Sequence, residues 1–456
     1  MFCRATRLAT ASNPCENTGH MVTESANSRL GRAWDTATIL LIYAAVVLPG
    51  FLRNAPFSDN RDEIKYHLPA IKQFAAQLPY PNLRAYSSAT TPLYHLIMAV
   101  LLRAGCGLMT LRVINLGLSV ATLLIVIAYF QRASANRSDW TAFSAGLLFA
   151  ICLLFVGPSL RLSTDNLPFG CAVAILYMID RDEKLSASRF ALAVFLAVVA
   201  VLTRQLYLWL VPLLGLYALM NDRWSLKGKL IAASASLIPL LSVLPFFLLW
   251  HGLINPQLAH KHVLRTGFIY GKGVVLIFCI LATYATAFAP VVIRALWPED
   301  ARGLSVLVFT FVVAIAVLPT FHAYAGSYSV PTEGGWIRAA AEYTPAVFHI
   351  WSLFWILFPL GCVVLAAMSY HTFTTGREVW ILAAFGVWML ANVMQSRATA
   401  KYFEPFEIVV VGRFAATIRS QWWENIPVWM LTALFFVVDI FRFWFGSPWA
   451  SPPLPR

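Results

Sequence analysis

Charge is scarce in this 456-residue sequence. Only 12% of its residues are Asp, Glu, Lys or Arg, 59% are apolar, and the mean hydropathy is +0.69. Average globular proteins carry about 25% charged residues, so this composition excludes an ordinary soluble domain. Because a helix satisfies its own backbone hydrogen bonds within lipid, the sequence predicts an all-α polytopic membrane protein.

Several other patterns are also missing. The seven cysteines occur singly, with no Cys-x-x-Cys spacing, which argues against a disulfide framework and a zinc site. Residues 1–33 are polar and contain no apolar signal-peptide core, so we expect a cytoplasmic tail there. We find no internal repeat and no soluble domain. The net charge of +13 is scattered over loops, which favours anionic lipid or phosphate partners and predicts no nucleic-acid partner.

Long apolar runs fill the rest of the chain. A membrane-spanning helix needs about 20 largely apolar residues. We predict spans at 34–53, 109–130, 139–158, 165–180, 188–203, 206–221, 230–250, 273–293, 303–322, 347–369, 379–396 and 427–446. A thirteenth candidate is the short run 404–418.

The spans divide the chain into predicted regions. These are a tail (1–33), a first transmembrane helix (34–53), a first external loop (54–108), a transmembrane core (109–250), an external basic loop (251–272), further transmembrane helices (273–322), an external aromatic loop (323–346), the C-terminal transmembrane helices (347–446) and a tail (447–456).

The orientation depends on the short apolar run 93–102. Arg103 and Gly105 interrupt it at about half a span, so we interpret it as an interfacial helix. Alternation then places the basic loops 131–138, 180–189 and 222–229 in the cytoplasm, as the positive-inside rule prefers. If the run spans the membrane instead, all three loops lie outside.

The first external loop concentrates charge directly after the first span. Its segment 57–67 contains Asp59, Asp62, Glu63, Lys65 and His67. Partial burial raises the pKa of a carboxylate at a membrane boundary and makes it a useful general base. The alternative is a solvated loop anchor.

A second polar group follows in the same loop. Pro92 suits the first turn of a helix that Thr90 or Thr91 would cap. Tyr94 and His95 would then face headgroups or a bound lipid sugar, or form a plain interfacial aromatic belt.

Two further positions lie next to apolar runs. Asp165 precedes a span, where it either caps the helix or belongs to a site. Arg204, followed by Gln205, stands between two apolar runs. An Arg at that depth usually faces a polar cavity, where its guanidinium could hold a lipid phosphate bidentately.

Two external segments are basic. The loop 251–272 contains His260, Lys261 and His262 without a carboxylate at ligand spacing, so we expect phosphate or headgroup contact and no metal site. Arg397, Lys401 and Tyr402 follow a late span and form a second candidate phosphate clamp.

In this order the motifs resemble the GT-C glycosyltransferases, which use polyprenyl-phosphate sugars. The closest pattern is that of the dolichyl-phosphate-glucose α-1,2-glucosyltransferases of N-glycan precursor assembly. Asp-Glu-x-x-His, Thr-Thr-Pro-x-x-Tyr, Thr-Asp, Arg-Gln and Arg-Tyr are echoed by Asp62-Glu63, Thr90-Thr91-Pro92-Tyr94, Thr164-Asp165, Arg204-Gln205 and Lys401-Tyr402. Leu-Arg-Val-Ile-Asn at 111–115 also fits. His67 lies one residue further from the acidic pair than in that pattern, Tyr94 is closer to the proline, and Lys401 replaces an Arg.

The resemblance implies a GT-C bundle of about 12–13 transmembrane helices and an inverting transfer of a hexose, best glucose, to a lipid-linked or extracytoplasmic glycan. Asp62 would be the base, ahead of Asp59 and Glu63, and Glu63 or His67 would orient the acceptor or the donor. Arg204, Lys261, Arg397 and Lys401 would stabilise the leaving phosphate, without a cofactor. We expect a site on the extracytoplasmic face of a bacterial inner membrane rather than the endoplasmic reticulum. The alternatives are an aminoarabinose- or mannosyl-type GT-C transferase and a lipid or sugar transporter or flippase.

Overall fold

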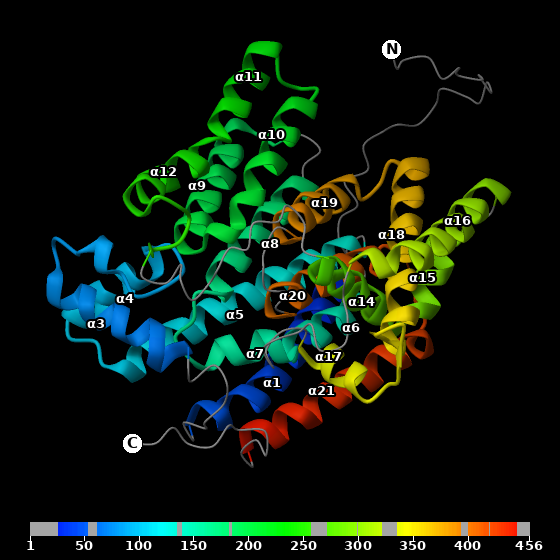
Figure 1. The fold of residues 1–456 in the computed structure, drawn as a ribbon, viewed down its shortest axis with the longest axis horizontal. Coiled ribbons are helices and arrows are strands. Elements are labelled where there is room, and N and C mark those ends of the chain that lie inside the picture. The colour runs from blue at the N-terminus through cyan, green and yellow to red at the C-terminus, as the bar shows by residue number, and fades with distance from the viewer. Residues whose placement is uncertain are drawn as a thin grey trace.

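The described structure is almost entirely helical (Figure 1). The computed structural model describes residues 26–52, 62–134, 139–181, 185–256, 271–298, 300–321, 335–393, 400–418 and 420–444. Within these ranges the only strands are β1 (Ala346–Val347) and β2 (Ile350–Trp351), which pair antiparallel. The all-α prediction is therefore confirmed for the part of the chain that is described.

The helices follow the predicted apolar runs closely. The α-helices are α1 (Ala26–Leu52), α3 (Leu68–Gln77), α4 (Leu93–Arg103), α5 (Leu108–Ala133), α6 (Trp140–Ala150), α7 (Leu153–Leu160), α8 (Asn166–Arg181), α9 (Ala187–Thr203), α10 (Leu210–Met220), α11 (Leu226–Ala235), α12 (Ile238–Trp250), α14 (Gly271–Ala287), α15 (Ala289–Leu296), α16 (Ala301–Val317), α17 (Gly335–Glu342), α18 (Ser352–Thr375), α19 (Val379–Val393), α20 (Glu404–Ala415) and α21 (Ile426–Trp444). Short helical turns are η1 (Glu63–His67), η2 (Leu83–Ala85), η3 (Gln205–Trp209), η4 (Leu318–Phe321), η5 (Ala400–Tyr402) and η6 (Trp422–Asn425). The first helix begins at Ala26, eight residues before its predicted start, so it takes in part of the predicted tail.

Six helical segments are long and apolar enough to cross a membrane. They are Arg29–Leu52, Leu108–Ala133, Leu226–Trp250, Ala301–Phe321, Ser352–Thr375 and Trp422–Arg442. The pair α6 and α7, bent by 50°, makes a seventh if it counts as one span. The chain is thus a polytopic membrane protein. Helices of 10–17 residues occupy most of the other predicted spans, so the count of 12–13 stays a prediction.

Helix α20 lies at the centre of the bundle (Figure 1). All twelve of its residues are buried, and it packs against α5, α6, α14 and α19. The helix allows no extra volume at Gly412, where a Cβ would come within 2.9 Å of the Phe130 ring. Only Phe403 separates its first residue, Glu404, from η5, so the buried helix fixes the position of Lys401 and Tyr402.

The first loop forms a separate side unit. Helices α3 and α4 pack against each other beside α12 (Figure 1), and a second apolar cluster containing Phe74, Tyr86, Tyr94 and Trp250 fills the space between them. The 93–102 run thus lies within the 11-residue helix α4. Its location at the membrane surface stays a prediction.

Buried charges join the helices at the other end of α20. Arg413 Nε lies 3.2 Å from Asp180 Oδ2, and its Nη2 lies 3.3 Å from Glu378 Oε1. Tyr129 donates a 2.6 Å hydrogen bond to Asp180. Two carboxylates thus share one guanidinium with little access to water.

We expect this cluster to make the stability of the folded protein depend on pH. Burial, with a smaller contribution from Asp180, raises the pKa of Glu378 to about 7 against the opposing charges of Arg413 and Arg377. A raised carboxyl pKa stabilises the fold fully below the unfolded value near 4.5, and that stabilisation is lost as the pH rises through about 7. The difference corresponds to at most about 3 kcal/mol.

We therefore expect Glu378→Gln to melt at a higher temperature than the wild type at pH 8 and at a similar temperature at pH 5. Thermal unfolding in detergent between pH 5 and 8 measures this. Glu342→Gln, at a carboxylate 46% exposed in an i,i+4 pair with Arg338, is the matched control and should show no such trend. A Glu378→Gln protein less stable than the wild type at pH 8 would contradict the prediction.

Candidate functional site

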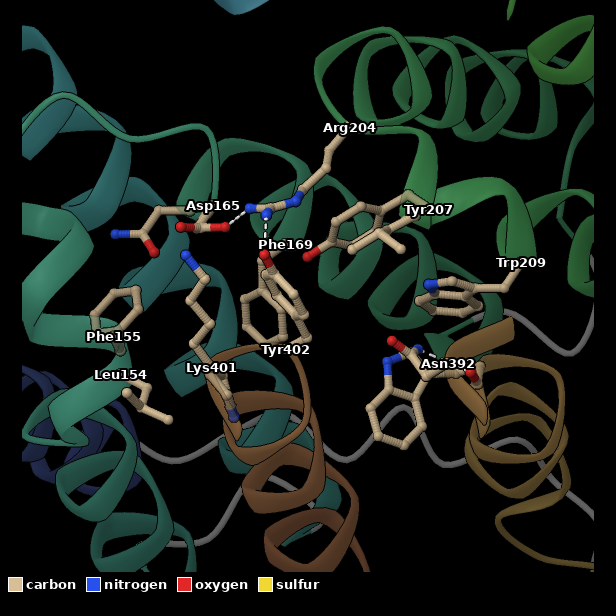
Figure 2. Close-up of a pocket in the computed structure, with 14 residues that line it drawn as sticks. Leu154, Phe155, Asp165, Phe169, Arg204, Tyr207, Trp209, Asn392, Lys401 and Tyr402 are labelled. Carbon is tan, nitrogen blue, oxygen red and sulfur yellow. Dashed lines mark hydrogen bonds and ion pairs between the residues drawn. The ribbon is translucent and has the colours of Figure 1, made fainter. Parts of the chain in front are cut away.

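A pocket opens where η3, α8, α19 and η5 meet (Figure 2). Asp165, Arg204, Lys401 and Tyr402 lie at one side of it. Its other lining residues include the aromatic side chains Phe155, Phe169, Tyr207, Trp209 and Trp388. Its volume is about 40 Å³, much less than the roughly 300 Å³ of a small ligand pocket. A ligand larger than a small anion would have to widen it.

Arg204 lies at the centre of the charged side. The chain leaves α9 at Thr203 and turns extended at Arg204, with φ −155° and ψ 114°, which directs the side chain to the pocket (Figure 2). There the guanidinium forms an ion pair with Asp165, donates a 2.7 Å hydrogen bond to the Tyr402 hydroxyl, and lies 4.5 Å from that ring's centroid. The sequence-based expectation that Arg204 faces a polar cavity agrees with this position.

Lys401 connects the pocket to the first loop. Its Nζ lies 3.2 Å from Asp62 Oδ2, across 339 positions of sequence, and 5.3 Å from the Tyr402 ring. Burial raises the pKa of the Tyr402 hydroxyl, but the charges of Arg204 and Lys401 outweigh burial and leave that pKa below its usual value. Both cations are paired with carboxylates in this structure, Arg204 with Asp165 and Lys401 with Asp62, so an anion would bind here by drawing a cation away from its partner.

The first loop carries Asp62 on a π-helical turn. In η1 the hydrogen bonds run from residue i to i+5, and the amide of Leu68 donates to the carbonyl of Glu63. Successive residues of an α-helix are about 100° apart, so Asp62 and His67 would point roughly 140° apart on one. A π-turn holds more residues per turn and brings them closer to one face. The π-turn thus brings Asp62 and His67 toward the same face of the loop.

Glu63 points into the protein. Its side chain is fully buried, and Arg112 binds both carboxylate oxygens at 2.8 and 2.9 Å. Arg161 Nε lies 3.7 Å from Oε2. Our sequence analysis overlooked both arginines, although a charged residue within an apolar run usually has a buried partner, and Arg112 belongs to the motif at 111–115. Glu63 does not line the pocket.

Four other predicted site residues hold the loop in place. Thr91 Oγ1 donates to the carbonyl of Val201 at 2.7 Å, and Gln205 donates to the carbonyls of Ala89 and Leu253 at 2.7 and 3.1 Å. Tyr94 donates to Asn115 Oδ1 at 2.9 Å, and His95 bonds to His67 at 2.9 Å.

The structure corrects two expectations about these residues. Tyr94 and His95 are buried, where we expected them to face headgroups or a lipid sugar, because α4 packs this face against α3 and α5. The residue capping α4 is Pro92, without a side-chain bond, so the predicted threonine cap is wrong. The Thr91 hydroxyl is engaged with α9 instead.

Some predicted residues lie outside the described residues. These are Asp59, His260, Lys261, His262 and Arg397, together with the first half (323–334) of the aromatic loop at 323–346. In the ranges given above, no group of three His, Cys, Asp or Glu side chains could hold a metal ion.

Comparison with known proteins adds no assignment. No family model, no curated protein and no solved structure matches the chain.

Proposed function

We propose that this protein is a membrane glycosyltransferase of the GT-C type. It would move a hexose, best glucose, from a polyprenyl-phosphate donor to a lipid-linked or extracytoplasmic glycan. The observation that carries this proposal is the Asp62–Lys401 ion pair beside Arg204 and Asp165. This arrangement places a water-accessible carboxylate, which can act as a base, beside two cations, which can stabilise a leaving phosphate.

The reaction would be a single inverting displacement. Asp62 takes the proton of the acceptor hydroxyl, whose oxygen attacks the anomeric carbon as the carbon–oxygen bond to phosphate breaks. The bonding pair leaves with the phosphate, where Arg204 and Lys401 offset the growing negative charge. No metal or cofactor is needed for this charge balance.

Substrate binding would also free the base. In the present structure Lys401 is paired with Asp62, whose side chain is 41% exposed. A donor phosphate that attracts Lys401 would release Asp62 for the acceptor. The aromatic wall of Trp209, Trp388 and Phe169 supplies a surface for a sugar or an isoprenyl chain, provided that the pocket widens.

The finer assignments are part of the same proposal. We place the site on the extracytoplasmic face of a bacterial inner membrane, in a bundle of about 12–13 spans, with Lys261 and Arg397 as further phosphate contacts. An aminoarabinose- or mannosyl-type transferase would use the same charged groups. A lipid or sugar flippase is the rival class, favoured by the buried Arg204.

The test is sugar transfer by the purified protein in detergent with polyprenyl-phosphate-glucose. We expect Asp62→Asn to lower kcat roughly 10²- to 10⁴-fold, the usual contribution of a general base, and Asp59→Asn to have a smaller effect. Asp222→Asn, at a side chain 96% exposed, is the control and should keep full activity. Full activity in Asp62→Asn would refute the base, and no turnover with any lipid-phosphate sugar would favour the flippase.

A further inference from the structure

Three aromatic side chains form a buried chain of hydrogen bonds that ends beside the pocket. The Tyr86 hydroxyl lies 2.5 Å from His95 Nδ1, and His95 Nε2 lies 2.9 Å from His67 Nδ1. Tyr86 and His95 are fully buried and His67 is 8% exposed. Within the described ranges, His67 Nε2 has no hydrogen bond.

Both imidazoles are neutral in this setting. Burial lowers the pKa of His67 to about 3, and the charges of Lys401 and Arg204 add to the shift. Burial also lowers the pKa of His95, with His67 adding to it. Each ring therefore carries one proton, and its position decides which nitrogen donates.

The position of the Tyr86 proton determines which nitrogen donates at each step of this hydrogen-bond chain. Apart from His95, the Tyr86 hydroxyl has Thr90 Oγ1 and the Thr91 carbonyl at 3.4 Å, and the Ser88 side chain also interacts with it. That distance is beyond the 2.5–3.0 Å usual for a hydroxyl donor to oxygen. Tyr86 therefore donates to His95 Nδ1, His95 donates through Nε2 to His67 Nδ1, and the His67 proton lies on Nε2.

The hydrogen-bond chain ends at His67, which lies within range of the charges of Lys401 and Arg204. His67 closes the same π-turn that Asp62 begins, and Asp62 contacts Lys401. The charges of Lys401 and Arg204 act on the His67 ring. His67 does not itself line the pocket, but the charges of both cations reach its ring, and an anion bound by these cations would come within the same range.

We propose that His67 is an uncharged hydrogen-bond donor to that anion through Nε2–H, with its tautomer fixed by His95 and Tyr86. The ligand class is a phosphate oxyanion; its identity as a lipid-linked phosphate rests on the proposed function. A ring already protonated at Nε2 accepts no proton there, so His67 is not the base. Because the ring is neutral throughout, any change of this bond between pH 5 and 8 comes from the phosphate, whose second pKa is about 6, and not from His67.

The first test observes the tautomer directly. In the full chain in detergent, ¹⁵N NMR of labelled histidines distinguishes protonated from bare ring nitrogens, and His67→Gln assigns the His67 signals. We expect a protonated Nε2 and a bare Nδ1 from pH 5 to 8. In Tyr86→Phe, both tautomers should be populated. A proton on Nδ1, or a titration of the His67 ring between pH 5 and 8, would overturn the inference.

The second test measures binding of polyprenyl phosphate without sugar, and of inorganic phosphate, which separates the headgroup from the lipid. The Gln amide offers both an N–H donor and a carbonyl acceptor, as the neutral ring offers a donor and an acceptor nitrogen, so His67→Gln should keep most of the affinity. His67→Leu should lose roughly 10- to 100-fold, the value of a hydrogen bond to a charged group. If leucine prevents folding, His67→Asn, whose amide is too short, replaces it.

The outcomes separate the two proposals. Equal affinities of the Gln and Leu variants for both phosphates would refute His67 as a donor. If polyprenyl phosphate binds as described but no sugar is transferred, the proposed function fails and the donor role stands.

Discussion

Arg204→Met is expected to lower kcat/KM for sugar transfer by roughly 10²- to 10³-fold, because it removes a preorganised donor from the developing phosphate charge. Arg204 also neutralises Asp165 and contacts Tyr402. The variant thus leaves Asp165, whose side chain is 21% exposed, as an unpaired negative charge at the anion site. Transfer kinetics with saturating acceptor measure the loss.

Two variants show which property of Arg204 matters. Arg204→Lys keeps the charge but loses the planar fork that pairs with Asp165 while lying against the Tyr402 ring, so we expect it to recover little activity. Arg204→Met combined with Asp165→Asn removes the unpaired carboxylate and should recover part of the affinity but not kcat. Arg189→Met, at an exposed position of α9, is the control. Wild-type kinetics in Arg204→Met would exclude this pocket as the transfer site.

Glu63→Gln is expected to cost about 3–5 kcal/mol of stability, the usual effect of breaking a buried ion pair. The substitution removes the fully buried Glu63 carboxylate that Arg112 and Arg161 contact. Denaturant or thermal unfolding in detergent measures the change. Because Glu63 adjoins Asp62, we also expect the π-turn to loosen and kcat to fall.

The control for Glu63 is a matched surface pair. Glu342→Gln breaks an exposed ion pair with Arg338 and should cost no more than about 1 kcal/mol. The double variant Glu63→Gln/Arg112→Gln should recover part of the lost stability, since it also removes one of the two cations that faced the lost carboxylate. A Glu63→Gln protein as stable as the wild type would show that the ion pair contributes little and that Glu63 has some other role.

The membrane fold was predictable because hydropathy belongs to each segment by itself. A long apolar run must form a helix in lipid, whatever it packs against, so every predicted span contains a helix. The same reasoning singled out Arg204, since a guanidinium between two apolar runs needs a polar environment. Charged or aromatic side chains near the ends of predicted spans also stood out, namely Asp62, Asp165, Lys401 and Tyr402.

Only the tertiary structure decided how these residues are paired. Asp62 and Glu63 are neighbours with the same chemistry, yet one reaches Lys401 across 339 positions and the other is enclosed by Arg112. The direction of each side chain follows from the π-turn and from the helices packed around it, which no local pattern encodes. Tyr86 carries no signal in sequence either, because its role depends on contacts with His95 that exist only in the folded loop.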